Sequence, residues 1–324
     1  TMRWTGRTQG IFTLLVSLEP EFSHALFRFE TCSSWPCGYG CFMMKIGSGL
    51  ALLSIALTGC ATATPMPQML SVPDGYKLVW SDEFDHDGLP DPTRWAYDTH
   101  RNADGWYNDE LQYYSAERSE NARVEGGHLI IEARQEPTPL EAFPDTGGQD
   151  YTSTRLFTSE RAAWQYGYFE IRAKLPCGRG LWPAIWTLPE GKRQWPDDGE
   201  IDIMEYVGWN PNEFHATVHT RDVNHVLGTQ FGASLHSNTA CGAFHTHSLL
   251  WTADDIFIAV DGEPYFHYPR GSKGYGEWPF DRAHHLILNI AIGGWGGQEG
   301  IDAAAFPARM EVDYVRVYQK ADAR

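Results

Sequence analysis

Basic residues are scarce in this chain of 324 residues, since 25 lysines and arginines stand against 42 aspartates and glutamates and leave a net charge of −17. Nucleic acid and anionic membrane surfaces repel such a chain, so we expect no nucleic-acid partner. A neutral polymer neither attracts nor repels it. The composition therefore permits a glycan as substrate without demonstrating one.

Long apolar runs are also missing. The apolar stretch from Ile46 to Leu57 has about a dozen residues, too few to cross a hydrocarbon core of about 30 Å. It follows Met44-Lys45 and ends in Leu57-Thr58-Gly59-Cys60, which is similar to a bacterial lipoprotein signal. We expect residues 44–60 to be a signal peptide and Cys60 to carry lipid. That places the protein at the outer membrane or cell surface, or in the periplasm.

The ends of this segment divide the chain. Residues 1–43 begin with Thr and show no clear periodicity, and we expect them to be a non-native upstream extension. Residues 61–75, in which Ala, Thr and Pro alternate at first, are expected to be a linker. The catalytic domain is expected at residues 76–320.

Cysteine is rare beyond Cys60, where only Cys177 and Cys241 remain. In an oxidising compartment these two residues could form a disulfide, and they could equally be buried free thiols.

No long amphipathic helix and no repeat of fixed period is evident. From Tyr76 onward, short runs of β-branched and aromatic residues are separated by Gly, Pro, Asn and Asp. Many short strands with turn signals between them predict an all-β sandwich or barrel in a single domain. The clearest of these runs are residues 77–80, 129–133, 166–173, 182–188, 200–207, 214–220, 256–260, 285–292 and 312–318.

One of these runs carries three carboxylates, because the chain reads Gly-Glu-Ile-Asp-Ile-Met-Glu-Tyr from Gly199 to Tyr206. Side chains alternate faces along a strand, so Glu200 and Asp202 share one face while Glu205 would point to the other. A β-bulge at Ile203-Met204 would bring Glu205 back to the acidic face. We therefore predict a bulged strand with all three acids together.

Crowded carboxylates repel one another and raise at least one pKa, which suits an enzyme that needs one ionised and one protonated acid. A retaining glycosidase needs such a pair, about 5–5.5 Å apart. The alternative is a solvated cluster of surface charge. The apolar residues Ile201, Ile203 and Met204 would have no purpose in a solvated loop, so catalysis is favoured.

Six segments, in this order along residues 76–319, resemble glycoside hydrolase family 16 and within it the laminarinase-like β-1,3-glucanases. The resemblance implies a β-jelly-roll sandwich of two antiparallel sheets with an open concave substrate cleft. The segments are Trp80-Ser81-Asp82-Glu83-Phe84, Asn108-Asp109-Glu110-Leu111-Gln112-Tyr113-Tyr114, Tyr151-Thr152-Ser153-Thr154-Arg155, Gly180-Leu181-Trp182-Pro183-Ala184-Ile185-Trp186, the acidic run, and Asp313-Tyr314-Val315-Arg316-Val317-Tyr318.

The resemblance gives each acid a role. Glu200 would be the nucleophile, Glu205 the general acid/base, and Asp202 the partner that keeps their ionisation states apart. Met204 matches the extra strand residue of members that cleave β-1,3 linkages, whereas the unbulged form marks lichenases. The implied activity is retaining endo-hydrolysis of β-1,3-glucan by double displacement, with no cofactor for catalysis.

Five further residues are expected to bind substrate. Trp182 and Trp186 are four apart and so share a strand face, and the resemblance places both in the cleft together with His219. Arg155 and Asn108 match positions that contact glycosyl units on the non-reducing side. His215 and His219 also suggest a metal site, but no third ligand is evident and strand histidines are more often hydrogen-bonded within the structure.

The resemblance also implies a structural calcium ion, held by Glu83, Asp313 and a backbone carbonyl near Gly127. We expect a monomer, with β-glucan as its partner and a membrane contact only through the lipid at Cys60.

Two alternatives remain open at this point. One is another enzyme of the same fold, such as a lichenase, agarase, carrageenase or transglycosylase. The other is a non-catalytic glucan-binding module, although pure binding would not require three crowded carboxylates.

Overall fold

The computed structural model describes residues 65–191 and 194–321, together with five short strands before residue 53. Contacts divide the chain into two compact units, Thr1–Thr62 and Ala63–Arg324. The first contains strands β1 (Arg3–Trp4), β2 (Phe12–Leu15), β3 (Phe27–Phe29), β4 (Met43–Ile46) and β5 (Gly49–Leu52). Cys60 and most of the proposed signal peptide lie outside the described residues. Among those that are described, no helix has the length and apolar character needed to span a bilayer.

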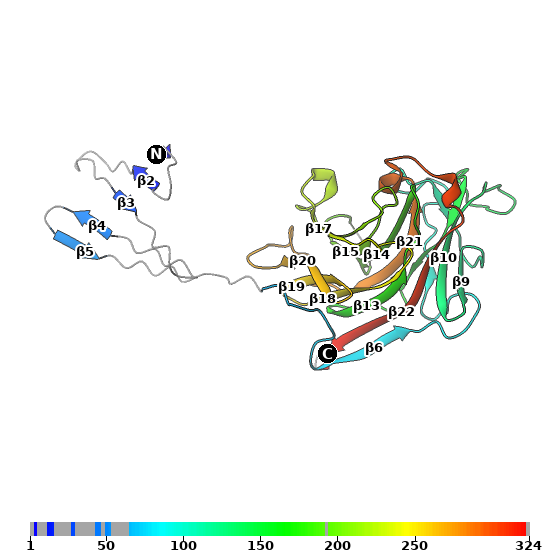
Figure 1. Ribbon diagram of the computed structural model, residues 1–324, viewed down its shortest axis with the longest axis horizontal. Helices are drawn as coiled ribbons and strands as arrows, with labels where there is room; N and C mark the ends of the chain where they lie inside the picture. Colours follow the sequence, from blue (N-terminus) through cyan, green and yellow to red (C-terminus); the bar gives the residue numbers. More distant parts are fainter. Residues whose placement is uncertain are drawn as a thin grey trace. The chain divides into compact units, whose positions relative to one another are not determined.

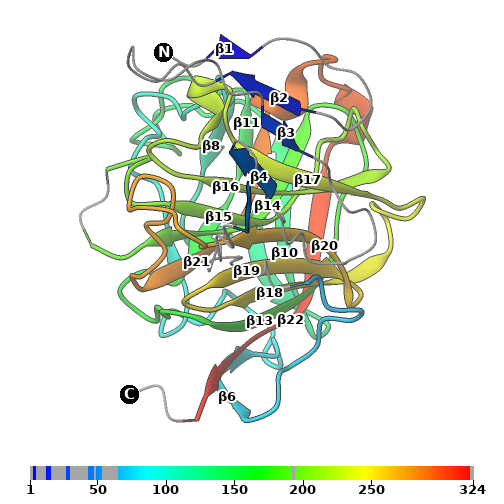
Figure 2. The ribbon, with the colours of Figure 1, turned by 90° about the vertical axis from the view of Figure 1, so that its left-hand side faces the viewer.

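The second unit is built from two sheets (Figures 1 and 2). Ten strands form the first sheet, in the order β20 (Glu263–Pro269), β19 (Asp255–Val260), β18 (Phe244–Trp251), β13 (Gly167–Lys174), β22 (Ala308–Lys320), β10 (His128–Gln135), β11 (Tyr151–Ser153) and β8 (Gln112–Tyr114), with β6 (Tyr76–Asp82) paired to β22 and β9 (Ala122–Glu125) to β10. Seven strands form the second, in the order β17 (Phe231–His236), β16 (Glu213–His219), β15 (Glu200–Glu205), β14 (Leu181–Pro189), β21 (His284–Ile292), β12 (Arg155–Phe157) and β7 (Ala96–Tyr97).

The only helices among the described residues are three single turns of 3₁₀ helix, namely η1 (His225–Leu227), η2 (Gly294–Gly297) and η3 (Ala303–Ala305). The predicted all-β sandwich is therefore confirmed. Nearly all strand pairs are antiparallel, and the pairing of β11 with β8 is parallel.

Apolar side chains from both sheets form one core between them. Ile131 and Ile171 of the ten-stranded sheet belong to the same fully buried cluster as Ile185 and Ile201 of the seven-stranded sheet. Burial of this kind is the main driving force for folding. The face of the seven-stranded sheet that does not contact the core is available to polar side chains.

Cys177 and Cys241 form a disulfide, with their Cα atoms 5.3 Å apart and a sequence separation of 64. It joins the β13–β14 connection to the β17–β18 connection. The sequence left this pairing open, and the structure resolves it in favour of the disulfide.

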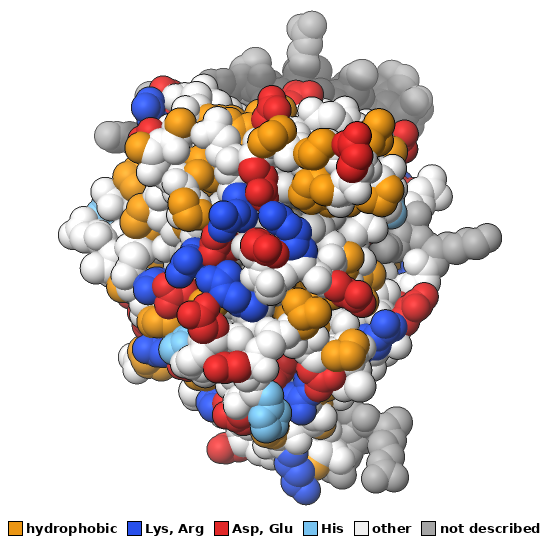
Figure 3. All heavy atoms as spheres, turned by 90° about the vertical axis from the view of Figure 1, so that its right-hand side faces the viewer, with side chains coloured by type: hydrophobic (Ala, Val, Ile, Leu, Met, Phe, Trp, Pro, Cys, Tyr) orange, Lys and Arg blue, Asp and Glu red, His pale blue; other side chains and the backbone are white. Residues whose placement is uncertain are grey.

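Charges of both signs are interspersed on the side of the molecule that carries β9 and β10 (Figure 3). The carboxylate of Glu132 is buried there, and it pairs with Arg123, Arg134 and Arg309. The carboxylate of Glu132 balances part of the positive charge of each of these guanidinium groups. The four side chains therefore form one network of ion pairs.

Candidate active site

A β-bulge in β15 brings the three acids to one face. Along β16, Asp202 pairs with Thr217 and Glu205 pairs with His215, so two residues of β15 face the single residue between them. Along β14, the register moves from Met204 directly to Asp202. The predicted bulge at Ile203-Met204 is confirmed. Both bulge residues are fully buried, which anchors the strand to the core while the acids face the cleft.

Glu200 and Glu205 each accept a hydrogen bond from an indole N–H. Trp195 Nε1 donates to Glu200 Oε2 at 2.9 Å, and Trp182 Nε1 donates to Glu205 Oε1 at 3.0 Å. Thr217 also donates its hydroxyl to Glu205 Oε2, at 3.4 Å. These donors fix the rotation of both carboxyl groups.

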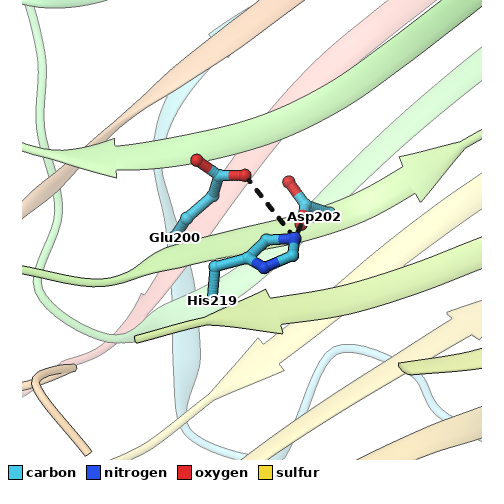
Figure 4. A group of neighbouring side chains, drawn as sticks. All are labelled: Glu200, Asp202 and His219. Carbon is cyan, nitrogen blue, oxygen red and sulfur yellow. Dashed lines mark ion pairs between the residues drawn. The ribbon is translucent and has the colours of Figure 1, made fainter. Parts of the chain in front are cut away.

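His219 of β16 lies beside Glu200 and Asp202 (Figure 4). Its Nε2 atom is 3.4 Å from Asp202 Oδ2 and 4.0 Å from Glu200 Oε1. Burial lowers the pKa of His219 to about 4, so the ring is neutral at neutral pH. The structure thus places His219 next to two of the acids, and its contact with substrate stays a prediction.

The acids are protonated more easily than ordinary carboxylates. Burial raises the pKa of Glu200 to about 7, although the hydrogen bond from Trp195 opposes this change. Burial and the nearby charge of Glu200 raise the pKa of Glu205 to about 7 as well. Burial, followed by the charges of Glu200 and Glu205, raises the pKa of Asp202 well above its ordinary value. The group can therefore hold protons near neutral pH and divide them among three carboxyls.

A cleft of about 810 Å³ lies over this face of the sheet. Its lining includes the three acids and extends from β15 over β14 and β21 to Arg155 of β12, and it also includes His225 and Val226 of η1. The other lining residues include His100, Tyr107, Asn108, Glu110, Arg155, Trp182, Trp186, Trp195, His225 and Asn289. Four of the five predicted substrate residues, Trp182, Trp186, Arg155 and Asn108, thus line the cleft. His219 contacts the acids from β16.

Arg155 is held rigidly at the side of the cleft formed by β12. Its guanidinium lies 4.6 Å from the ring centre of Trp186 and 5.2 Å from that of Trp106. Its Nε atom is 3.1 Å from Asp98 Oδ2, and both side chains are buried. Burial alone would raise the pKa of Asp98, but the charge of Arg155 together with His100 lowers it. The side chain of Arg155 is therefore a fixed, charged donor.

Asn108 owes its position to an unusual backbone conformation. Asn108 and Asp109 have φ of 57° and 58°, in the left-handed region that Asn and Asp enter more readily than other side chains.

The structure adds functional residues that were not predicted from the sequence. Glu110 lines the cleft, accepts a hydrogen bond from Gln112 at 2.8 Å and has its pKa raised to about 6 by burial. Asn289 of β21 accepts the indole N–H of Trp186 at 2.7 Å. Trp195 binds Glu200. Glu110 belongs to the same matched segment as Asn108, and that position was a signal for it in the sequence. Nothing in the sequence indicated Asn289 or Trp195.

A group of possible metal ligands occurs at the acids themselves. Within the described part of the chain, Glu200, Asp202 and His219 offer three ligand atoms within 4.8 Å of one another (Figure 4). His215, the other half of the histidine pair, instead packs against Trp295 at a ring distance of 4.9 Å.

The three positions expected to hold calcium lie close to one another around β22. Glu83 follows β6 and binds Arg316 of β22 through both oxygens, at 2.9 and 2.7 Å. Asp313 binds Arg172 at 2.6 Å and lies 3.8 Å from His128, the neighbour of Gly127. Both carboxylates are thus neutralised by arginines, which a calcium ion would have to displace. The donor set does not fit a calcium ion as these side chains lie, and calcium stays a prediction.

Comparisons with known proteins agree with this geometry. The family model for glycosyl hydrolases family 16 matches residues 109–316. The chain is 54% identical over 254 residues to a beta-glucanase of Rhodothermus marinus, which covers 75% of this chain and 85% of that protein. The crystal structure of the laminarinase from Rhodothermus marinus has a TM-score of 0.71 at 52% identity, covering 76% of this chain and 98% of the other.

A third similarity shows the related cleft with sugar in it. A mutant of a non-specific endo-β-1,3(4)-glucanase from the same family has a TM-score of 0.76 at 55% identity, covering 80% of this chain and 100% of the other. That crystal structure presents a 1,3-β-D-cellobiosyl-glucose at its active site.

Proposed function

Since the chain belongs to glycoside hydrolase family 16, we propose that it is a retaining endo-hydrolase of β-1,3-glucan of the laminarin type. The observation that carries this proposal is the bulged strand β15, which brings Glu200, Asp202 and Glu205 to one cleft face with raised pKa values. Relatives named laminarinase or endo-β-1,3(4)-glucanase share more than half of the aligned residues, which supports the same substrate class.

The first half of the reaction breaks the glycosidic bond. The ionised carboxylate of Glu200 attacks the anomeric carbon while the protonated carboxyl of Glu205 gives its proton to the departing oxygen. The products are a glycosyl ester on Glu200 and a free sugar hydroxyl on the leaving part. Trp182 and Thr217 hold Glu205 in place for this proton transfer.

The second half restores the enzyme. Glu205, now ionised, takes a proton from water, and the resulting hydroxide attacks the anomeric carbon and releases Glu200. Two inversions retain the configuration. Burial and the neighbouring carboxylates raise the pKa of Asp202 well above its ordinary value, so this residue can keep a proton between Glu200 and Glu205 and limit the total negative charge of the three acids.

We expect the purified protein to release a mixture of oligosaccharides from laminarin early in the reaction, with the β-anomer appearing first. The open cleft admits a chain at any point along its length, and double displacement sets the anomer. Chromatography measures the sizes of the products, and proton NMR shows which anomer appears first. Mixed-linkage glucan and agarose serve as parallel substrates, and cleavage of either in preference to laminarin would contradict the proposed linkage. Binding without release from any polymer would indicate a glucan-binding module.

The proposal includes anchoring by lipid. We propose a monomer that is exported and held at the outer membrane or cell surface, or in the periplasm, through lipid on Cys60. Expressed in a Gram-negative bacterium, the protein should incorporate labelled palmitate and sediment with membranes, and Cys60→Ser should do neither while keeping full activity. Mass spectrometry of the N-terminal peptide gives the modification directly. A wild-type protein without lipid would contradict the anchor.

The calcium prediction is tested by stability. If Glu83, Asp313 and the Gly127 carbonyl bind calcium, millimolar Ca²⁺ should raise the unfolding temperature by a few degrees and EDTA should reverse it. Glu83→Gln should remove the response. An unfolding temperature that does not depend on calcium would show that the arginine pairs take the place of the ion.

A further inference from the structure

Two carboxylates and one histidine meet beside the cleft in an arrangement that suits a transition-metal ion. Glu200 of β15 pairs directly with His219 of β16, and Asp202 lies two residues along the same face. Cross-strand partners and their diagonal neighbours lie within reach of one another. One oxygen of Glu200, one oxygen of Asp202 and one nitrogen of His219 therefore converge, all within 4.8 Å of one another (Figure 4).

The distances between these ligand atoms are close to the edges of a tetrahedral site. Zinc binds histidine nitrogen and carboxylate oxygen at about 2.0–2.2 Å, which places neighbouring ligand atoms of a tetrahedron about 3.3–3.6 Å apart. His219 Nε2 is 3.4 Å from Asp202 Oδ2 and 4.0 Å from Glu200 Oε1. Only a small rotation of the Glu200 side chain is needed to complete the set.

The carboxylate atoms that face His219 are not engaged by other donors. Asp202 is 3% exposed, and its Oδ2 atom makes no hydrogen bond within the described part of the chain. Glu200 accepts the indole N–H of Trp195 on Oε2, so Oε1 is the oxygen turned toward His219. A buried polar oxygen without a partner is costly, and a bound ion would satisfy it.

No basic side chain balances these acids directly. Among the residues that the structure describes, no lysine or arginine forms an ion pair with Glu200, Asp202 or Glu205, and His219 is the one basic group beside them. Buried carboxylates in proteins are normally paired with a cation or coordinate a metal. A divalent cation would supply that positive charge. It can reach the acids because Glu200 and Asp202 line the open cleft.

We propose that Glu200, Asp202 and His219 bind a divalent transition-metal ion of the zinc type, and that the bound ion inhibits the enzyme by occupying the nucleophile Glu200. Calcium and magnesium prefer oxygen ligands throughout, whereas imidazole nitrogen suits zinc, copper and nickel. Three protein ligands with water in the fourth position are the usual set of an open zinc site. Binding of the ion is independent of the proposed function, and the inhibition rests on it.

Binding is measured on the full-length protein without an affinity tag, by calorimetry with Zn²⁺ and by the visible spectrum of Co²⁺, whose absorption reports a four-coordinate site. We expect binding in the micromolar range. His219→Gln removes the nitrogen ligand and should weaken it about 100-fold or more, since loss of an outer hydrogen-bond partner alone costs about 10–100-fold. Asp202→Asn keeps the shape of the side chain and should weaken it similarly. Zinc affinity equal to wild type in both variants would overturn the site, as would absence of binding to the wild type.

The matched control is His245→Gln, which changes a histidine beside a carboxylate elsewhere in the molecule. His245 Nδ1 is 2.6 Å from Asp261 Oδ2, and its Nε2 is 2.9 Å from the carbonyl oxygen of Thr239, outside the lining of the cleft. This variant should bind zinc as tightly as wild type and keep full activity. Equal loss of zinc binding in His245→Gln and His219→Gln would overturn the assignment, because it would indicate binding to histidines in general.

Inhibition is measured separately, on laminarin. Zn²⁺ should raise the apparent KM and leave kcat unchanged, because the sugar and the ion compete for the same place beside Glu200. The inhibition constant should equal the dissociation constant from calorimetry, EDTA should restore activity, and Mg²⁺ at the same concentration should have no effect. Zinc that lowers kcat without changing KM would overturn the competition. A wild-type protein that binds zinc through His219 but hydrolyses no glucan would instead overturn the proposed function and support the metal site.

Discussion

Glu200→Ala is expected to lower kcat on laminarin by a factor of about 10⁴ or more with the fold intact, because no other group can form the glycosyl ester. Glu205→Ala is expected to lower it by about 10²–10⁴, the usual contribution of a general acid/base. Reducing-sugar release over hours measures both rates, and the circular dichroism spectrum checks the fold. Turnover near wild type in either variant would contradict the assignment.

A small anion distinguishes the two roles. Azide can occupy the space left by a missing carboxylate and attack the anomeric carbon. In Glu205→Ala it would displace the ester on Glu200 and give a β-glucosyl azide, whereas in Glu200→Ala it would attack the substrate directly and give the α-product. The control is Glu311→Ala, since Glu311 of β22 pairs with Lys174 on the ten-stranded sheet and does not line the cleft. That variant should match wild type and form no azide product.

The acidic strand could be predicted because its information is local. Alternation of side chains places Glu200 and Asp202 together, and only an extra residue can bring Glu205 to the same face. The spacing of the acids placed the bulge at Ile203-Met204, and the register of β15 against β14 and β16 confirms it. The all-β class followed in the same way from short strands and turns.

The rest of the site depends on contacts between distant segments. Asn289 meets Trp186 because β21 pairs with β14, and Asp98 meets Arg155 across the edge of the same sheet. No spacing in the sequence encodes either contact. The order of strands within each sheet, and the disulfide between Cys177 and Cys241, were likewise outside the reach of a single sequence.

The grouping of the acids also has a cost for stability. A carboxyl with a pKa near 7 in the folded protein and an ordinary value of 4.5 elsewhere binds its proton more tightly when folded. Between about pH 4.5 and pH 7 this carboxyl is ionised in the unfolded chain but still protonated in the folded protein. The free energy of unfolding therefore falls as the pH rises through this window. Below about pH 4.5 the penalty is absent because both states are protonated. Above pH 7 it is fully present.

Glu205→Gln should therefore unfold at a higher temperature than wild type at pH 8, although it is inactive. The amide keeps the acceptor for Trp182 and can donate to Thr217, so the packing is preserved while the buried charge is gone. The gain is expected to be roughly 1 to 3 kcal/mol at pH 8 and to fade towards pH 4. Scanning calorimetry of both proteins from pH 4 to pH 8 measures the difference, with Glu311→Gln as the control that should show no such pH dependence. Equal or lower stability of Glu205→Gln at pH 8 would mean that the cleft solvates the three carboxylates fully. A gain would mean that the protein gives up stability at neutral pH to keep a proton available at Glu205.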